Sequence, residues 1–157
     1  MIVKALYESE GERLPVIAHW GIASGDFVQR VGPDLLEDMD IAVIQTFSFL
    51  HQNNPIAAKL LKQFRATFGS TDAASIPAVV GVAHAYDLVH MLAQAAKQAG
   101  ATDTESLRTA LENLPAFNGA VKKYTPPFTA DRHDALWADD YFMASYNKDG
   151  NLIPIKR

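Results

Sequence analysis

The stretch LPVIAHWGIASGDFVQRV, residues 14–31, decides the fold that we expect for this chain. Residues 14–18 are apolar and rich in β-branched side chains, with a proline near the start, where a missing backbone donor is tolerated. This pattern predicts a strand that is covered on both faces. After residues 19–21 break the run, we expect Ser24 to cap a helix that begins near Gly25, with Asp26 in its first turn.

A second apolar, β-branched run follows at residues 41–47, after Gly32-Pro33 ends the predicted helix. The order strand, helix, strand predicts a βαβ unit with a right-handed crossover and two parallel strands. Ligands of open α/β sheets bind beyond the carboxyl ends of the strands. We therefore expect residues 20–24 and residues 47–49 to face one cleft.

The rest of the chain is predicted to be helical and then to return to strands. Helices are expected at 2–8, at 55–68 and at 77–98, and Thr102 with Glu105 forms a capping box for another. The helix at 77–98 is apolar around most of its circumference, which indicates burial on more than one side. Residues 121–124 indicate a strand, and residues 140–146 and 152–155 indicate a hairpin around Lys148-Asp149-Gly150.

Composition excludes several classes of function. The 157 residues include 18 acidic and 14 basic side chains, a formal charge of −4, which argues against a nucleic-acid partner. Without cysteine there is no thiolate metal site or thiol nucleophile. Residues 1–12 lack the features of a signal peptide, and polar residues interrupt the longest apolar region, residues 76–96, so we expect no membrane span.

Polar side chains of the chain suggest little catalytic or metal chemistry. Ser24 lies outside a GxSxG elbow, so we interpret it as a helix cap rather than a nucleophile. His84 and His90 are about 240° apart on a helix and cannot share a metal ion, while Asp87 and His90 are spaced as a surface pair. The glycines at 21 and 25 match no phosphate-binding loop. We expect neither a metal nor another cofactor.

Aromatic residues form the more informative set. Trp20, Phe47 and Phe49 follow the two predicted parallel strands, and Tyr86 lies on the long helix. Aromatic side chains at strand ends often line concave apolar binding sites. The alternative is that each belongs to an ordinary hydrophobic core.

The ordered series of motifs resembles the later part of a branched-chain amino-acid solute-binding protein of an ABC transporter, a type I periplasmic binding protein. The resemblance covers nearly all of the chain and rests on LPVIAHWGIASGDF, DIAVIQTF, AYDLVHMLAQAAKQAG, TESLRTALENL, DRHDAL and the final hairpin. It implies an α/β fold with two Rossmann-like, three-layer lobes that close on a small ligand. It also implies a protein that is not an enzyme, in the periplasm or outside the cell, with a membrane permease as its partner.

The resemblance also implies ligand contacts and a division into lobes. Trp20, Gly21 and Ile22 match the loop that contacts the ligand from the second lobe, and we add Phe47 and Tyr86 as candidate contacts. Residues 1–47 are assigned to the second lobe, 48–118 to the first, and 119–157 to the second again. His19-Trp20 stands where amino-acid binders often carry an acidic residue, which favours an aromatic or aliphatic carboxylate over an α-amino acid.

Two alternatives remain open at this point. One is a small α/β enzyme with a strand-end site between Trp20 and Asp26. The other is a self-associating module without a ligand. The resemblance covers only the later part of a binding protein, which would leave sheet edges and apolar faces uncovered, so we expect homo-oligomers, formed by exchange of elements between copies.

Overall fold

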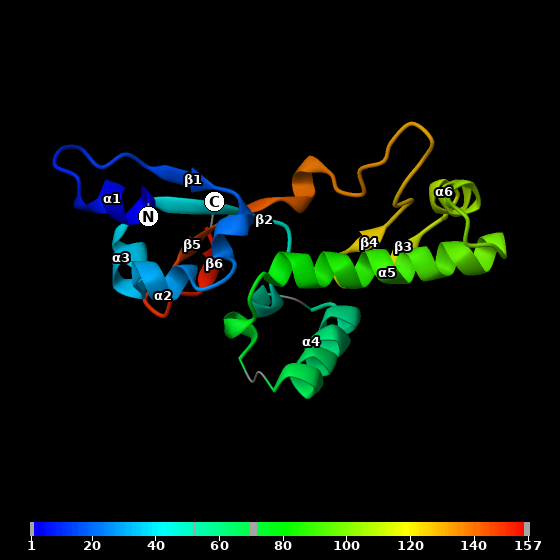
Figure 1. The fold of residues 1–157 in the computed structure, drawn as a ribbon, viewed down its shortest axis with the longest axis horizontal. Coiled ribbons are helices and arrows are strands. Elements are labelled where there is room, and N and C mark those ends of the chain that lie inside the picture. Colours follow the sequence, from blue (N-terminus) through cyan, green and yellow to red (C-terminus); the bar gives the residue numbers. More distant parts are fainter. Residues whose placement is uncertain (1, 52, 70–71, 156–157) are drawn as a thin grey trace. The chain divides into compact units, whose positions relative to one another are not determined.

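The structure is a computed structural model that describes residues 2–51, 53–69 and 72–155 (Figure 1). The chain divides into two compact units. Unit 1 comprises the described parts of Met1–Thr46, Asp72–Ala78 and Tyr141–Arg157. Unit 2 comprises the described parts of Phe47–Thr71 and Val79–Asp140. The chain therefore passes between the units four times.

Unit 1 contains a four-stranded sheet in the order β1-β2-β5-β6 (Figure 1). Its strands are β1 (Val16–Ala18), β2 (Ile41–Gln45), β5 (Phe142–Tyr146) and β6 (Leu152–Pro154). β1 pairs with β2 in parallel, which confirms the predicted βαβ unit. β5 and β6 form the predicted antiparallel hairpin, and β5 also pairs antiparallel with β2. Gly150 has φ +74° in the hairpin turn, a backbone conformation that favours glycine.

Three short helices cover one face of this sheet. They are α1 (Ile2–Glu8), α2 (Phe27–Val31) and α3 (Pro33–Asp38). Their buried side chains join those of the strands in one core, made of Val3, Phe27, Val31, Leu36, Ile41, Val43 and Tyr146. Sequence reasoning missed α3, because Gly32-Pro33 ends one helix and Pro33 then occupies the first turn of the next, where its missing N–H is harmless.

The prediction that β1 is covered on both faces is wrong. β1 is an edge strand, and the side chain of Ile17 is 80% exposed. Val16 and Ala18 alternate with it and pack against the core of unit 1. An apolar run does not reveal whether a strand is covered on one face or two, because cover depends on neighbours elsewhere in the chain.

Unit 2 is mainly helical, with α4 (Pro55–Phe68), α5 (Val79–Ala99) and α6 (Thr104–Glu112). α4 has the predicted bounds. Asp103, not Thr102, caps α6, because its carboxylate accepts from the N–H of Ser106 at 3.0 Å. α5 was predicted to be buried on more than one side, but Leu88, Val89 and Leu92 on one of its faces are exposed. Among the described residues, no helix combines the length and the hydrophobicity that a membrane-spanning segment needs.

The segment after α6 contains a two-stranded sheet of β3 (Phe117–Asn118) and β4 (Lys123–Tyr124). β4 is a shortened form of the strand predicted at 121–124, and β3 was not predicted. This segment clusters with unit 2 as far as Asp140, whereas the sequence-based division places a boundary at residue 118. The assignment of segments to lobes stays a prediction. Four short 3₁₀ helices complete the described structure: Trp20–Ala23, Phe49–His51, Ala73–Ser75 and Ala138–Asp140.

Candidate functional site

The loop after β1 is a short 3₁₀ helix, Trp20–Ala23, held in place by the residues on either side of it. His19 precedes this turn in an extended conformation, and its Nδ1 accepts a hydrogen bond from the Gly21 N–H at 3.1 Å. Ser24 follows, and its Oγ donates to the Gly21 carbonyl oxygen at 2.7 Å. Both polar groups of the Gly21 backbone therefore have local partners.

His19 and Trp20 form an aromatic pair at the carboxyl end of β1. Their ring centroids are 3.6 Å apart, and the ring planes are inclined by 38°. His19 is exposed and Trp20 is partly exposed. Because Nδ1 of His19 accepts a hydrogen bond, a neutral imidazole carries its proton on Nε2, as a donor. Sequence reasoning did not include His19 among the candidate contacts. The signal was its position directly after the strand, next to Trp20.

The other two predicted residues of this loop have different surroundings. Gly21 is exposed, and Ile22 is partly buried and packs against the core of unit 1. Ile22 thus anchors the loop to the sheet. Gly21 is therefore the more exposed of these two residues.

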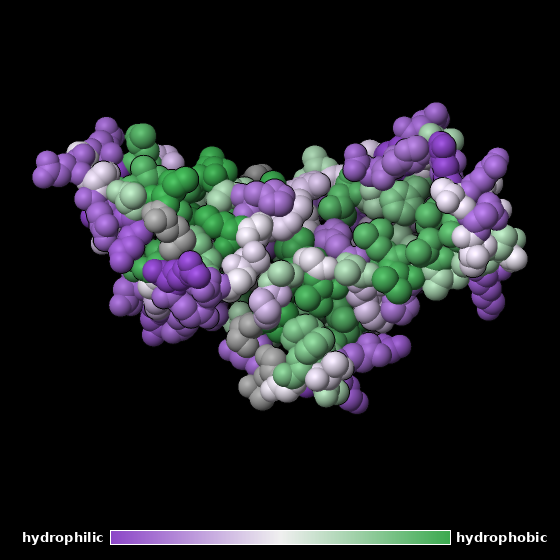
Figure 2. Space-filling model, in the orientation of Figure 1, coloured by the Kyte–Doolittle hydropathy of each residue, from purple (hydrophilic) through white to green (hydrophobic). Residues whose placement is uncertain are grey.

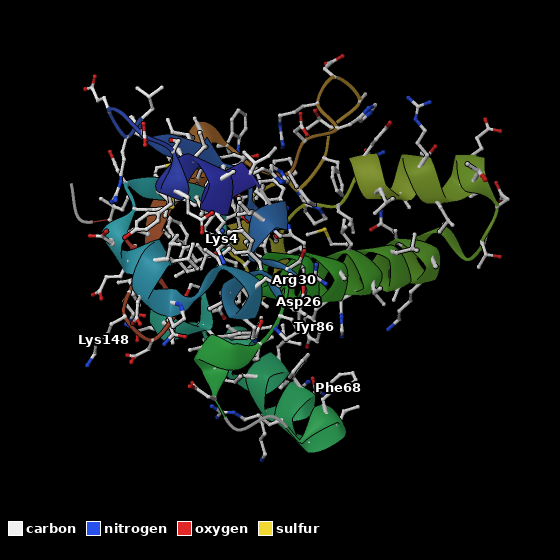
Figure 3. The ribbon with its side chains drawn as sticks, turned by 60° about the vertical axis from the view of Figure 1, so that its left-hand side comes forward. Lys4, Asp26, Arg30, Phe68, Tyr86 and Lys148 are labelled. Atoms are coloured by element: carbon white, nitrogen blue, oxygen red, sulfur yellow. The ribbon has the colours of Figure 1, made fainter. Side chains whose placement is uncertain are left out.

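Ser24 does not cap a helix, contrary to the prediction. α2 begins only at Phe27, after Asp26, whose carboxylate makes no capping hydrogen bond. That carboxylate instead accepts from Arg30 Nε at 2.7 Å (Figure 3), and this hydrogen bond lowers the pKa of Asp26. Ser24 Oγ donates to a backbone carbonyl, whereas an activated nucleophile donates to a base.

Phe47 and Tyr86, the remaining predicted contacts, belong to unit 2. Phe47 is fully buried, and its ring lies edge-on to that of Phe49 with centroids 4.8 Å apart. This arrangement matches the alternative that Phe47 is a core residue. Tyr86 is partly buried on α5 (Figure 3), and its ring lies 4.1 Å from that of His90. Since Trp20 belongs to unit 1, a cleft shared by these residues stays a prediction.

Asp87 is not part of a surface pair with His90, contrary to the prediction. Its side chain is 1% exposed, and its carboxylate accepts from the backbone N–H groups of Ala120 at 2.5 Å and Val121 at 2.9 Å. The hydroxyl of Tyr124 donates to the same carboxylate at 3.0 Å. His90 Nδ1 lies 2.8 Å from the carbonyl oxygen of Tyr86 on its own helix. Spacing along α5 could not reveal Asp87's partners, because they lie more than 30 residues away.

The surroundings of Asp87 are fitted to its carboxylate. A Cβ atom at Gly119 would overlap the carboxylate group, so a glycine is required there. Burial, followed by the neighbouring Asp87 charge, raises the pKa of Tyr124. Burial also lowers the pKa of His84, against the effect of Asp87. These contacts join α5 to the segment at 119–124, which gives Asp87 a structural role.

Glu112 on α6 contacts a basic side chain and a histidine. Glu112 accepts from Arg108 Nε at 2.8 Å, and His133 Nε2 lies 3.1 Å from the same oxygen. Both contacts lower the pKa of Glu112. Within 2–51, 53–69 and 72–155, no three His, Cys, Asp or Glu side chains are grouped to hold a metal ion.

Comparison with known proteins identifies the family. A model of the periplasmic binding protein family matches residues 14–151, so this chain belongs to that family. No curated protein matched. The matched region contains the parallel β1–β2 pair, the strand-end loop and β5, and it ends one residue before β6.

Solved structures with the same fold include several binding proteins. The branched-chain amino acid transporter substrate-binding protein LivJ of Streptococcus pneumoniae, solved in complex with isoleucine, is 23% identical over 98% of this chain, with a TM-score of 0.72. A leucine-binding protein LivK of Thermotoga maritima is 17% identical over 99%, with a TM-score of 0.74. A type 1 periplasmic binding protein of Bordetella pertussis is 23% identical over 90%, with a TM-score of 0.74.

The chain spans about two fifths of the length of these structures: 41% of LivJ, 40% of LivK and 39% of the Bordetella protein. At these identities the likeness shows the fold. The α/β fold of a type I periplasmic binding protein, expected from the sequence, is therefore confirmed.

Proposed function

We propose that this chain supplies ligand-contacting elements of the solute-binding component of an ABC transporter. The observation that carries the proposal is the loop Trp20–Ala23, which ends a parallel strand pair in a member of the periplasmic binding protein family. Loops at the carboxyl ends of parallel strands are where α/β sheets bind ligands. The protein delivers its solute to a membrane permease from the periplasm or the cell exterior, and it catalyses no reaction.

The solute is a small organic molecule such as an amino acid or an aromatic or aliphatic carboxylate. Trp20 offers an aromatic surface for the apolar part, and Nε2 of neutral His19 is a donor for a carboxylate. The sequence between His19 and Ser24 contains no acidic residue to pair with an ammonium group. These features favour a carboxylate. LivJ was solved with isoleucine, which keeps aliphatic amino acids in the tested range.

The other predicted contacts enter the proposal with different roles. Gly21 is exposed beside Trp20, while Ile22 supports the loop from the core. Tyr86 is the proposed contact from unit 2. Phe47 contacts a solute only if its segment opens, because its side chain is fully buried in this structure. Closure of two lobes around a hinge is the motion by which such contacts meet a ligand.

The test uses the two tryptophans of the chain. In the Trp137→Phe variant, Trp20 is the sole tryptophan, so its fluorescence reports directly on the proposed site. We expect at least one member of a panel of amino acids, aromatic acids and short-chain carboxylates to change this fluorescence saturably. The same solute should also raise the melting temperature. At a concentration of 100 times the Kd, its binding should stabilise the folded state by about 2.7 kcal/mol.

The matched control is Trp20→Phe, which leaves Trp137 as the sole tryptophan. It should show no saturable change with the same solute, and His19→Ala should weaken the binding of a carboxylate about tenfold through loss of one hydrogen bond. A panel without any effect on the fluorescence of Trp20 or on the melting temperature would remove solute binding as the function of this chain.

A further inference from the structure

The sequence contains one Asn-Gly pair, Asn118-Gly119. In such a pair, the backbone nitrogen of the glycine can attack the side-chain amide of the asparagine. Glycine favours this reaction because it has no Cβ to hinder the approach and because its backbone rotates freely. Asn118 is the last residue of β3 and is exposed. The pair therefore places a reactive group at the surface of unit 2.

The reaction needs no co-reactant other than water. The Gly119 nitrogen loses its proton and forms a bond to Cγ of Asn118, the bond from Cγ to Nδ2 breaks, and ammonia leaves with that proton. Water then opens the cyclic succinimide. Opening at Cγ gives aspartate. Opening at the main-chain carbonyl carbon gives isoaspartate, in which the backbone runs through the side chain and is longer by a methylene group.

The fold holds Gly119 in an arrangement that opposes this reaction. Its N–H donates to the carbonyl oxygen of Lys122 at 2.9 Å, and its own carbonyl oxygen accepts from Asn54 Nδ2 at 2.8 Å. Asn118 is paired with Lys123 across the β3–β4 sheet. Attack on Cγ requires the Gly119 nitrogen to give up its proton and to turn toward the Asn118 side chain. Both changes require that the N–H leave its hydrogen bond.

Asp87 holds residues 119–124 in this closed arrangement. Its buried carboxylate accepts from the N–H groups of Ala120 and Val121, which follow the pair, and from the hydroxyl of Tyr124. β3 and β4 lie beside α5, which carries Asp87 (Figure 1). Hydrophobic residues gather on this part of the visible surface (Figure 2). The reaction therefore requires that residues 119–124 open away from Asp87.

The same carboxylate requires the glycine that makes the pair reactive. A Cβ atom at position 119 would lie 2.8 Å from Oδ1 of Asp87 and closer still to the other atoms of the carboxylate group. Any residue other than glycine would therefore push the segment away from Asp87. The contact that protects the Asn-Gly pair thus also requires its glycine.

We propose that Asn118 is a site of spontaneous deamidation whose rate is set by the contacts of Asp87. The closed arrangement protects the pair, and each transient opening of residues 119–124 exposes it to reaction. When opening and closing are fast, the rate follows the population of the open form. Isoaspartate at 118 lengthens the backbone directly before the Asp87 contact, so the modified segment does not close again. All these groups belong to unit 2, and no solute is involved.

Peptide mass spectrometry after incubation at neutral pH tests the proposal, because it measures the fraction of Asn118 that has become an acid. Tyr124→Phe removes a donor to Asp87 and should accelerate the reaction roughly 30-fold, since it raises the population of the open form. Asn54→Ala frees the Gly119 carbonyl oxygen and should act in the same direction. Tyr146→Phe, the same chemical change in unit 1, is the matched control and should leave the rate unchanged.

Two further comparisons separate the effect of the fold from the chemistry of the pair. In urea, the unfolded forms of all these proteins should deamidate at one rate, faster than the native unaltered chain. In the native state, the amides of Ala120 and Val121 should lose hydrogen-exchange protection in the isoaspartate form. They should keep it in Asn118→Asp, which has the new charge but a backbone of normal length.

Four results would overturn the proposal. An unfolded chain that does not deamidate at Asn118 would show that the pair is not a modification site. Equal rates in the native and unfolded chain would show that the fold gives no protection. Equal native rates in the unaltered chain, Tyr124→Phe and Asn54→Ala would show that these contacts do not set the rate. Full protection of Ala120 and Val121 in the isoaspartate form would show that the modified segment closes.

Discussion

Two buried tyrosines of this chain differ in what their hydroxyl groups contact. The hydroxyl of Tyr124 donates to the Asp87 carboxylate at 3.0 Å. The hydroxyl of Tyr146 is buried without a hydrogen-bond partner among the described residues. A satisfied hydroxyl stabilises the fold, whereas an unsatisfied one carries a desolvation penalty that phenylalanine would remove.

We therefore predict opposite effects for the same chemical change. Tyr124→Phe should lower the free energy of unfolding of unit 2 by about 2 kcal/mol, because it removes a hydrogen bond to a buried carboxylate. Tyr146→Phe should leave the stability of unit 1 unchanged or raise it. Native-state hydrogen exchange of core amides in each unit measures both. Equal losses in the two variants would contradict this account.

Tyr146 also makes the stability of unit 1 depend on pH. Burial raises its pKa to about 12, above the value near 10 that it has when unfolded. Because the folded pKa is the higher one, the folded state favours the neutral phenol. The resulting stabilisation is complete below pH 10 and is lost as the pH rises from 10 through 12.

The expected loss is at most about 2.7 kcal/mol for a shift of two pKa units. Urea unfolding at pH 9 and at pH 12, followed by a probe in unit 1, measures it in the unaltered chain and in Tyr146→Phe. Because the variant lacks the phenol, its free energy of unfolding should fall less between pH 9 and pH 12 than that of the unaltered chain. The same decline in both proteins would show that Tyr146 does not titrate as described.

At the scale of elements, the N-terminus of α4 is fixed by more than an ordinary cap. Asn54 Oδ1 accepts from the Ile56 N–H at 2.9 Å, and Nδ2 donates to the carbonyl oxygens of Gly119 at 2.8 Å and Ala120 at 3.0 Å. Asp103 makes only a local cap at α6. Asn54 therefore connects α4 to the same segment that Asp87 holds against α5.

We expect Asn54→Ala to lower the free energy of unfolding by about 3 kcal/mol, because it removes a cap and the donor to two carbonyl oxygens. Asp103→Ala should lower it by about 1 kcal/mol, because it removes only a cap. Exchange of the amide protons at the start of α4 and α6 reports each loss. Protection at Ala120 and Val121 should also fall in Asn54→Ala and stay unchanged in Asp103→Ala. Similar costs for both caps would refute the added role of Asn54.

At the scale of the whole molecule, the chain forms two compact units, and the core around Leu36 and Val43 lies in unit 1. Asp87, Gly119 and Tyr124 lie in unit 2, while Val43 and Tyr146 lie in unit 1. Asp87→Ala leaves three donors without their buried acceptor. We predict that it lowers exchange protection throughout α5 and at residues 119–124, by about 3 kcal/mol, and leaves the β2 amides unaffected.

A matched control for this prediction is Asp139→Ala, an exposed carboxylate of unit 2. It should change protection in neither unit, because surface substitutions away from special contacts have little effect. Loss of protection in β2 on replacement of Asp87 would show that the two units unfold as one.

Much of the fold was predicted from the sequence, because local patterns specify local elements. Pro55 and the apolar spacing at 55–68 define α4, residues 148–150 define the hairpin turn, and the spacing of residues 14–47 predicts the parallel pair. The same elements, in the same order, indicated the periplasmic binding protein family, whose model matches residues 14–151. Each of these signals depends on residues within a few turns or one crossover of each other.

The candidate site was predicted only in part. The position of Trp20 at the carboxyl end of β1 follows from the strand pattern, but the stacking on His19 and the burial of Phe47 do not. The ligand-contacting role of all five predicted residues stays a prediction. Aromatic side chains have the same sequence signal whether they line a cleft or fill a core.

Local patterns along the chain were enough to predict α4, the final hairpin, the βαβ unit and the family. The burial of Asp87, the 3₁₀ turn that Ser24 closes and the exposure of Leu88, Val89 and Leu92 on α5 became visible only in the folded chain. The physical reason is that periodicity and capping are properties of neighbouring residues. Burial and hydrogen-bond partnership depend on which distant segment packs alongside, as residues 119–124 do for Asp87.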